Sequence, residues 1–459
     1  MNVTIENDLI KIYNADPTTI ADLRQELSYT DKAKQYQIKR MMKNPFQKNS
    51  PFLKKLQKEV NATLLIEKDT HVEFPSGMVH LLDSSWNLQD LRKETGKKIT
   101  IPWVNKPFDP RPYQEEAIEI MDKNYRGLIN FATGLGKTLT ATHFIRHYKR
   151  NTLVVCPSES VANQFYEELR SAFGDSKVGF FGDGKRKIKD ITVGIAMSVN
   201  NHVQEFVKAD LGLVIFDEVH HLAATTFYNI VQGLGNVGKI FGLTATDFRA
   251  DGKDVMITAG VGQTLLKRDV VWGVKNGWLA DPIFIVRKVP TTGRSYKDDK
   301  NKNYKEHVLN CKLMKDQILS DIQKFLAAGK QVLCLVDETA HGKELSEQLN
   351  CPFATGLDKN SQEYVKQLNK GKIQCLVGTD GKISEGTDTK NVHVLVLANF
   401  AAGKGPVLQA IGRGMRKVPG KDNVIILDYM PTGSDMMTRH TNMRISYYNE
   451  ITKNVKVIE

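Results

Sequence analysis

The chain has 459 residues, which at about 100–200 residues per domain predicts two to four domains. Hydrophobic residues make up 41% and charged residues 25%, which excludes a mostly disordered chain and a small disulfide-stapled scaffold. The formal net charge of +12 favours a polyanionic partner without identifying it. The five cysteines are widely spaced and include no C-x-x-C pair, so we expect neither a zinc site nor a disulfide framework.

The sequence contains no segment typical of a membrane span or a signal peptide. Residues 219–238 lack Asp, Glu, Lys and Arg but contain His, Thr, Asn, Gln and several glycines. The N-terminal sequence MNVTIENDLI has no basic region followed by an apolar core. We therefore expect a cytoplasmic, intracellular protein without a membrane partner.

Residues 1–100 predict a small, basic α+β accessory domain that binds nucleic acid. Strand-like runs occur at 62–68, 71–75 and 77–82. Residues 31–60 contain nine Lys or Arg residues and two acidic residues, a net charge of +7, with three aromatic residues among them. Lysines can bind phosphates while aromatic faces stack on bases, although a solvated helix face is an equally good interpretation. The candidate nucleic-acid contacts here are Lys39, Arg40, Lys43, Lys54 and Lys55.

Residues 101–281 alternate apolar runs with helix-period stretches. Near-continuous apolar strands that alternate with helices predict a parallel sheet covered on both faces, with ligands at the carboxyl ends of its strands. The expected strands are residues 127–133, 152–158, 191–199, 211–218 and 239–246.

Residues 282–435 repeat this α/β pattern after a polar stretch at 291–306, which we expect to be a flexible loop. The expected strands are residues 331–337, 373–379, 392–399 and 423–429. Residues 436–459 are polar and are expected to form a C-terminal tail.

The sequence ATGLGKT at 132–138 lies between an expected strand and an expected helix. A Gly-rich turn before a helix start cradles phosphate with backbone N–H groups and the helix dipole. Lys137 would reach the β- and γ-phosphates of ATP, and the Thr138 hydroxyl would hold Mg²⁺. Phe131 stands where the strict phosphate-loop pattern has its first glycine. The cradle itself consists of Thr133, Gly134, Leu135 and Gly136.

The sequence DEVHH at 217–221 follows the apolar run LGLVIF. A carboxylate at the carboxyl end of a strand in the same sheet as the phosphate loop is placed to hold Mg²⁺, and its neighbour can activate water. We assign Asp217 to the metal and Glu218 to the general base. An acidic turn that caps the next helix is the alternative.

The sequence QAIGRGMR at 409–416 carries Arg413 and Arg416, three residues apart and therefore expected on one helix face. Arginines that reach a γ-phosphate from another domain neutralise transition-state charge. An exposed basic helix end is the alternative.

Together, ATGLGKT, DEVH, GLTAT (242–246), SEGTD (384–388) and QAIGRGMR, in this order, resemble the superfamily 2 DExH helicases and nucleic-acid translocases. The resemblance spans roughly residues 108–430 and implies two tandem RecA-like parallel-sheet domains with ATP between them. It also implies further roles. Arg111 and Gln114 would recognise adenine, and Pro157 and Ser158, with residues 196–199, would contact the nucleic-acid strand. Thr244 and Thr246 would couple hydrolysis to nucleic-acid binding. Gly386 and Asp388 would lie beside the ribose and the strand backbone, and Gln409 would position water.

The stretch GLTATDFRADG (242–252) resembles a subgroup that contains UvsW-type branch-migration helicases, XPB-type repair helicases and restriction-enzyme translocases, except that Asp247 replaces the usual proline. The resemblance implies an ATP- and Mg²⁺-dependent DNA helicase that remodels forks or Holliday junctions in recombination, repair or replication. Its partner would be single-stranded, forked or four-way DNA, and the enzyme a monomer or weak oligomer. A phage-encoded enzyme acting in a host cytoplasm fits this subgroup.

Three alternatives stay open. The motor motifs contact the nucleic-acid backbone, so they do not distinguish a DNA helicase from an RNA helicase or from a duplex translocase that never separates strands. A degenerate motor that serves as an ATP-regulated scaffold would lack the base or the arginines. Glu218, Arg413 and Arg416 are all present, which argues against the scaffold.

Overall fold

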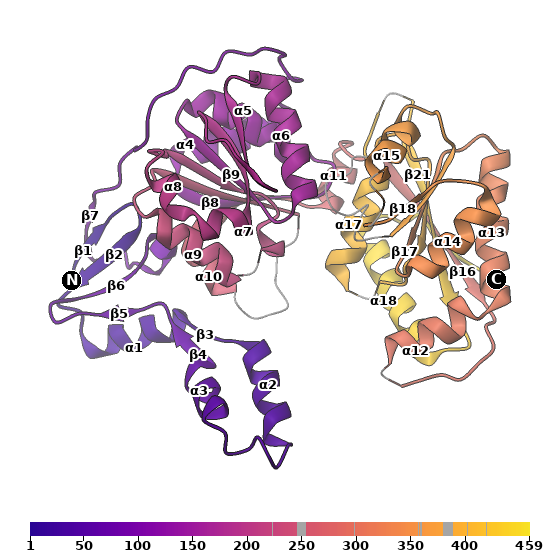
Figure 1. The fold of residues 1–459 in the computed structure, drawn as a ribbon, viewed down its shortest axis with the longest axis horizontal. Coiled ribbons are helices and arrows are strands. Elements are labelled where there is room, and N and C mark those ends of the chain that lie inside the picture. Colours follow the sequence, from indigo (N-terminus) through magenta and orange to yellow (C-terminus); the bar gives the residue numbers. More distant parts are fainter. Residues whose placement is uncertain are drawn as a thin grey trace. The chain divides into compact units, whose positions relative to one another are not determined.

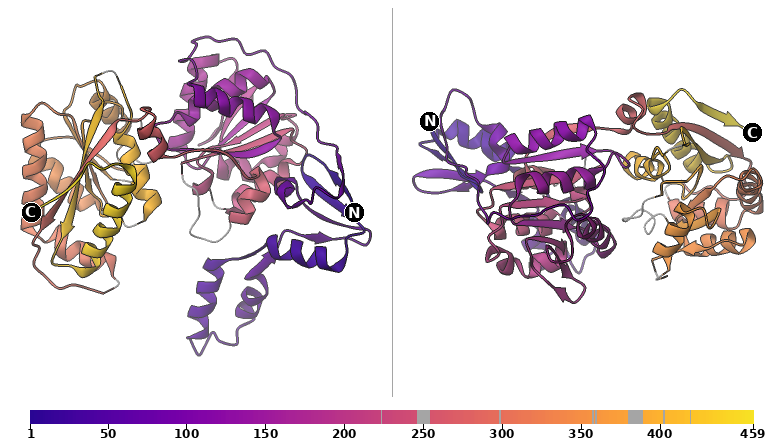
Figure 2. Two further views of the ribbon diagram at one scale, coloured as in Figure 1. Left: turned by 180° about the vertical axis from the view of Figure 1, so that it is seen from behind. Right: turned by 90° about the horizontal axis from the view of Figure 1, so that it is seen from above.

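The computed structural model describes residues 1–222, 224–245, 254–297, 299–356, 358, 360–379, 389–401, 403–418 and 420–459. The chain divides into two compact units. The first comprises Met1–Phe131 and Gly136–Lys267, and the second comprises Ala132–Leu135 and Arg268–Glu459. Each unit contains a mainly parallel sheet with helices packed against it, which confirms the predicted α/β class (Figures 1 and 2). None of the described helices is long and apolar enough to cross a membrane.

The N-terminal region of the first unit is an α+β structure around a five-stranded sheet with the order β5-β6-β2-β1-β7. Its elements are β1 (Asn2–Ile5), β2 (Leu9–Tyr13), α1 (Pro17–Glu26), β3 (Ser28–Thr30), α2 (Lys32–Met42), α3 (Pro51–Glu59), β4 (Asn61–Thr63), β5 (Ile66–Glu67), β6 (His71–Pro75), η1 (Ser76–Leu81) and β7 (Asn87–Asp90). The strand expected at 77–82 is wrong, because η1 is a short 3-10 helix. A Cβ at Gly77 would lie 2.3 Å from the carbonyl oxygen of Thr258, so the backbone turns here against a neighbouring helix.

Residues 28–63 leave this sheet as a separate arm. The two-stranded ribbon β3-β4 forms its base, and α2 and α3 lie side by side beyond it (Figure 1). The arm has its own small core of Ile38, Met41, Leu53 and Leu56. The charged stretch that the sequence singled out is therefore a folded helical hairpin.

The rest of the first unit is an eight-stranded sheet with the order β11-β10-β12-β9-β13-β14-β8-β15. Its elements are α4 (Pro112–Lys123), β8 (Arg126–Phe131), α5 (Lys137–Tyr148), β9 (Thr152–Cys156), α6 (Glu159–Phe173), β10 (Val178–Gly182), β11 (Lys185–Arg186), β12 (Ile191–Ile195), α7 (Ala196–Asn201), α8 (Val203–Val207), β13 (Leu213–Phe216), η2 (Val219–His221), α9 (Ala224–Leu234), β14 (Lys239–Thr244), α10 (Asp254–Val261) and β15 (Thr264–Arg268). All five strands expected in this region are present, and their pairing is parallel. The strand expected at 191–199 is wrong over residues 196–199, because β12 ends at Ile195 and α7 begins at Ala196. Because β8, β14 and β13 are neighbours, the segments that follow them meet at one edge of the sheet.

A buried arginine connects the N-terminal region to the rest of the first unit. Arg126, at the start of β8, donates from Nε to the carbonyl oxygen of Asn7 over 3.2 Å and from Nη1 to that of Gly260 in α10. Ala259 of α10 also belongs to the N-terminal apolar core. Burial lowers the pKa of Arg126 to about 10, yet the group stays a cation at neutral pH.

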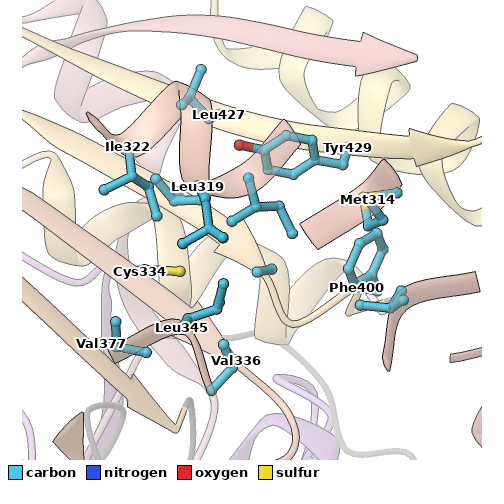
Figure 3. Close-up of a cluster of buried hydrophobic side chains, with 14 of the residues drawn as sticks. Met314, Leu319, Ile322, Cys334, Val336, Leu345, Val377, Phe400, Leu427 and Tyr429 are labelled. Carbon is cyan, nitrogen blue, oxygen red and sulfur yellow. The ribbon is translucent and has the colours of Figure 1, made fainter. Parts of the chain in front are cut away.

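The second unit is a seven-stranded sheet with the order β18-β19-β17-β20-β21-β16-β22, parallel at each described pair. Its elements are α11 (Val270–Lys275), β16 (Asp281–Val289), α12 (Lys300–Tyr304), η3 (Lys305–Leu309), α13 (Lys312–Ala327), β17 (Val332–Val336), α14 (Thr339–Leu349), β18 (Phe353–Ala354), α15 (Ser361–Asn369), β19 (Cys375–Thr379), β20 (Val394–Ala398), α17 (Lys404–Gly414), β21 (Asn423–Pro431), α18 (Asp435–Ile451) and β22 (Val455–Ile458). Figure 3 shows a hydrophobic core of this unit, where Met314, Leu319 and Ile322 of α13 pack over Cys334 and Leu427 of the sheet. The four strands expected here are confirmed, and the loop expected at 291–306 contains α12.

Residues 436–459 are an integral part of the second unit, so the expected tail is wrong. They form most of α18 and all of β22, which pairs with β16 at the edge of the sheet. Arg444 is buried and donates from Nε and Nη2 to the two carboxylate oxygens of Asp428 at 2.7 and 2.8 Å. Tyr448 donates to the same carboxylate over 2.8 Å and stacks on Phe284.

Candidate nucleotide-binding site

The segment between β8 and α5 has the backbone geometry of a phosphate cradle. Gly134 and Gly136 have φ angles of 91° and 80°, in the left-handed region that favours glycine. Gly136 is the N-cap of α5, so the helix begins at Lys137 with its first backbone N–H groups at this turn. Thr133, Gly134, Leu135, Gly136 and Thr138 therefore lie where the sequence predicted the cradle.

Lys137 is buried and held by two groups of the sheet edge. Its Nζ lies 3.1 Å from Oε1 of Glu218 and donates to the carbonyl oxygen of Phe131 over 3.3 Å. Phe131, which replaces the first glycine of the strict pattern, ends β8 and is fully buried. The phenylalanine therefore packs in the hydrophobic core before the loop, and the glycine turn itself is unchanged.

Gln114 connects the predicted adenine motif to the cradle. Its Oε1 accepts from the backbone N–H of Arg111 over 2.9 Å, and its Nε2 donates to the carbonyl oxygen of Gly136 over 3.3 Å. Arg111 also donates to the hydroxyl of Tyr113, over 3.2 Å. Both polar atoms of the buried Gln114 amide thus form hydrogen bonds within the protein, so Gln114 also fixes the turn before α5.

Asp217 follows β13 directly, and its carboxylate is buried. Burial raises the pKa of this group well above its usual value, repulsion from Glu218 raises it further, and Lys137 opposes both effects. Oδ1 of Asp217 is buried without a hydrogen-bond partner among the described residues. An oxygen ligand of this kind, at the end of a strand in the same sheet as β8, which leads to Thr138 of α5, fits a Mg²⁺ site.

A chain of polar contacts links the cradle to the end of β14. Oε2 of Glu218, opposite the oxygen that meets Lys137, lies 3.5 Å from Nδ1 of His220. The same nitrogen lies 2.7 Å from Oγ1 of Thr244, which is buried at the end of β14. Glu218 has a φ of 45°, and this turn brings both of its carboxylate oxygens into the chain.

The role of His220 was not predicted, although the letters DEVH contain it. His220 follows β13, and its partner Thr244 ends β14. The two residues meet because β13 and β14 are neighbours in the sheet. We define the set Lys137, Glu218, His220 and Thr244 as the polar relay.

The predicted strand-contacting residues Pro157 and Ser158 follow β9 and are half-buried. Ser158 is the N-cap of α6, where its Oγ accepts from the backbone N–H of Val161 over 3.5 Å. Residues 196–199, expected next to them, begin α7. These groups start helices at the ends of adjacent strands, β9 and β12.

In the second unit, the expectation that Arg413 and Arg416 share a helix face is wrong. Arg413 is buried within α17, which ends at Gly414. Arg416 lies beyond the helix and forms an isolated β-bridge with Leu279. Gln409 is half-buried on α17, one turn before Arg413.

Thr246, Gly386 and Asp388, which the sequence assigned to coupling and to the ribose and strand backbone, lie outside the described residues. The same holds for Asp247, Arg249, Asp251 and Gly252 of the subgroup pattern.

Comparisons with known proteins agree with this geometry. Residues 107–249 match the family model "Type III restriction enzyme, res subunit" (ResIII). A candidate DNA 3'-5' helicase named Rad25, from Halobacterium salinarum, is 26% identical over 399 residues, which cover 83% of this chain and 63% of that protein. The ATP-dependent DNA helicase uvsW of Enterobacteria phage T4 is 25% identical over 390 residues, which cover 78% of this chain and 75% of that protein. The chain thus spans less than two thirds of the length of the Rad25 relative.

Among solved structures, yeast Dbp5 bound to RNA and ADP BeF3 superimposes with a TM-score of 0.56 and 13% identity, covering 76% of this chain and 89% of that one. At this identity the likeness concerns the fold alone, and it identifies the two parallel-sheet units as tandem RecA-like domains.

Proposed function

We infer the activity of this chain from its family: it is a superfamily 2 DExH helicase of the UvsW type, and we propose that it is an ATP-driven DNA helicase or translocase that acts on branched DNA. Recombination, repair or replication would supply such substrates. The proposal has three parts: hydrolysis of ATP at the candidate site, coupling of hydrolysis to DNA, and selection of the substrate.

For hydrolysis, we propose that the cradle 133–138 binds the phosphates and that Lys137 exchanges its contact with Glu218 for the β- and γ-phosphates. The 3.1 Å ion pair supports this step, because it holds the ammonium at the cradle. Glu218, once released, would accept a proton from the attacking water. Asp217 and Thr138 would hold Mg²⁺, which neutralises charge on the phosphates when bound.

For the second unit, we propose that Arg413 stabilises the developing charge and that Gln409 orients water, with Arg111 and Gln114 at the adenine. Binding of ATP would favour a closed arrangement of the two units, and hydrolysis would release it. Arg416 remains a candidate for stabilising the same developing charge, although it lies in a β-bridge and not on the helix.

The single observation that carries the proposal is the polar relay. It connects the phosphate lysine, the proposed base and the strand end that the family uses for coupling, through contacts of 3.1, 3.5 and 2.7 Å. We propose that a change at Glu218 reaches Thr244 through these contacts. Mutation of Lys137 to Ala should abolish nucleic-acid-stimulated ATPase activity, and a fully active variant would contradict the site.

For the substrate, we propose that the basic arm holds duplex or junction DNA while the motor pulls one strand. Lys39, Arg40, Lys43 and Lys54 are exposed and make no ion pair with a described residue, whereas Lys55 lies 3.9 Å from Glu59. Unpaired cations bind phosphate without first breaking a protein contact. An RNA helicase or a duplex translocase would use the same motor, so substrate panels must separate these alternatives.

A further inference from the structure

The turn between α2 and α3 lies at the end of the arm farthest from its β3-β4 base (Figure 1). Apolar side chains in and beside this turn are exposed. Phe46 lies in this turn and is 96% exposed. Met42, at the end of α2, and Phe52, at the start of α3, are about half exposed. We call these three residues the tip.

The arm core does not account for the tip. Ile38 and Met41 of α2 meet Leu53 and Leu56 of α3 on the facing sides of the hairpin, and this cluster includes neither Phe46 nor Phe52. An aromatic ring in water contributes almost nothing to folding, so packing within the arm does not hold Phe46 in this position.

The backbone of the turn is nevertheless ordered. The N–H groups of Gln47 and Lys48 donate to the carbonyl oxygen of Asn44 at 3.0 and 3.1 Å. Oδ1 of the same asparagine accepts from the N–H of Phe46 over 3.1 Å. Pro45 restricts the chain between them. The ring is therefore presented on a fixed turn, which lowers the entropic cost of binding through it.

Basic side chains surround the tip. Lys43 and Lys48 flank Phe46 in sequence, and both are exposed without an ion pair to a described residue. Arg40 lies in the last turn of α2, which ends just before Lys43, and the exposed Tyr36 lies one turn earlier on the same face. A flat apolar ring among free cations matches a nucleobase attached to phosphates.

We propose that Phe46 stacks on an unpaired base at the branch point, while Lys43 and Lys48 bind the adjoining phosphates. This inference rests on the proposed function, because it requires DNA as the substrate. Within an intact duplex both faces of each base are covered by its neighbours, so a ring finds a free base face only at ends, gaps and branches. The tip would therefore give the arm a preference for branched over continuous duplex that the lysines alone cannot supply.

The test compares the affinity of the full-length protein for two DNAs of equal length, one fully paired and one with a few unpaired bases at its centre. A fluorescent adenine analogue at the unpaired position reports stacking directly. We expect the wild type to prefer the gapped DNA and to quench the analogue. Phe46→Ala should lower this preference by about 5- to 150-fold, the range for loss of one stacked base, with duplex affinity changed less than twofold.

Three variants define the cause. Phe46→Leu keeps an apolar group without a stacking face and should behave like Phe46→Ala, whereas Phe46→Trp should retain both preference and quenching. Lys43→Ala with Lys48→Ala should weaken binding to both DNAs by the same factor. Ile66→Ala, which truncates an exposed apolar residue outside the arm, should change neither.

Preference retained in Phe46→Ala or in Phe46→Leu would overturn the stacking proposal, as would a wild type that binds both DNAs equally. Either result would leave the proposed function intact if the protein still binds duplex DNA. A wild type that binds neither DNA would instead contradict the proposed function itself.

Discussion

Lys137 Nζ lies 3.1 Å from Glu218 Oε1, which joins the cation proposed to bind phosphate to the carboxylate proposed to activate water. The two residues come from different segments, the start of α5 and the end of β13. Phosphate that takes Lys137 away from Glu218 would raise the basicity of that carboxylate at the moment when a base is needed.

Mutation of Lys137 to Ala should lower ATP turnover by about 100-fold or more, because removal of one preorganised donor to transition-state charge costs about that much. Lys123→Ala, at the exposed end of α4, is the matched control and should turn over like the wild type. ATPase rates with and without DNA are the measurement. Equal rates for Lys137→Ala and the control would remove Lys137 from the site.

Mutation of Asp217 to Asn should abolish turnover and yet stabilise the fold without ligand. A carboxyl whose pKa is raised by burial binds its proton more tightly in the folded than in the unfolded state. Its contribution therefore becomes less favourable as pH rises from the ordinary value of 3.8 through the raised one.

Thermal unfolding of Asp217→Asn against the wild type checks this sign. The gain in Tm should be larger at about pH 8 than at about pH 5, because the wild-type carboxyl is ionised only at the higher pH. Asp69→Asn changes an exposed carboxylate and should show no such pH dependence. A gain that is equal at both pH values would show that the Asp217 carboxyl is not perturbed.

Mutation of Thr244 to Val should weaken coupling, since it removes the hydroxyl that lies 2.7 Å from Nδ1 of His220 and conserves volume. The ratio of DNA-stimulated to basal ATPase turnover should fall, by about 5-fold or more for a lost hydrogen bond of about 1 kcal/mol. Thr152→Val alters a buried threonine at the opposite end of the sheet, at the start of β9, and should preserve the ratio. If both variants keep the wild-type ratio, the polar relay does not transmit coupling.

Reversal of Lys39, Lys43 and Lys54 to Glu should weaken junction binding and reduce its salt dependence. Each phosphate contact contributes about one unit to the slope of log K against log salt concentration, so the slope should become shallower by about three. Titrations at several salt concentrations measure it. The matched control reverses three exposed lysines outside the arm, Lys123, Lys208 and Lys275. A slope that changes as much in the control would mean that the arm has no special part in binding.

Mutation of Arg444 to Met should destabilise the second unit by about 3–5 kcal/mol, because it leaves Asp428 buried without its bidentate partner. Urea unfolding monitored across the transition gives the loss. Arg439→Met, on the exposed face of the same helix, should be within about 0.5 kcal/mol of the wild type. A small effect of Arg444→Met would indicate that water reaches Asp428.

Strands such as β13, β17 and β20 could be predicted because each is apolar over its whole length, the pattern that burial on two faces requires. The C-terminal helix α18 could not, because the side chains that it buries include Arg444 and Thr441. The burial of Arg444 depends on Asp428, a partner on another element, which spacing along the chain does not reveal.

In the site, the sequence placed Lys137, Asp217 and Glu218 at strand ends of the same sheet, and the fold brings Lys137 and Glu218 together there. Arg416 was misplaced because α17 ends at Gly414, and a glycine near a helix end is a stop signal that the three-residue spacing ignored. The contact between His220 and Thr244 depends on strand order, which local patterns do not determine.

The measurement that tests the central claim most directly is ATPase stimulation and strand separation by the full-length protein on linear, forked and four-way DNA and on an RNA duplex of matched sequence, with Lys137→Ala as the inactive reference. The account predicts that forked and four-way DNA stimulate turnover most and are unwound or branch-migrated, with little response to RNA. Strongest stimulation by the RNA duplex, or turnover that no branched DNA increases above linear DNA, would contradict it.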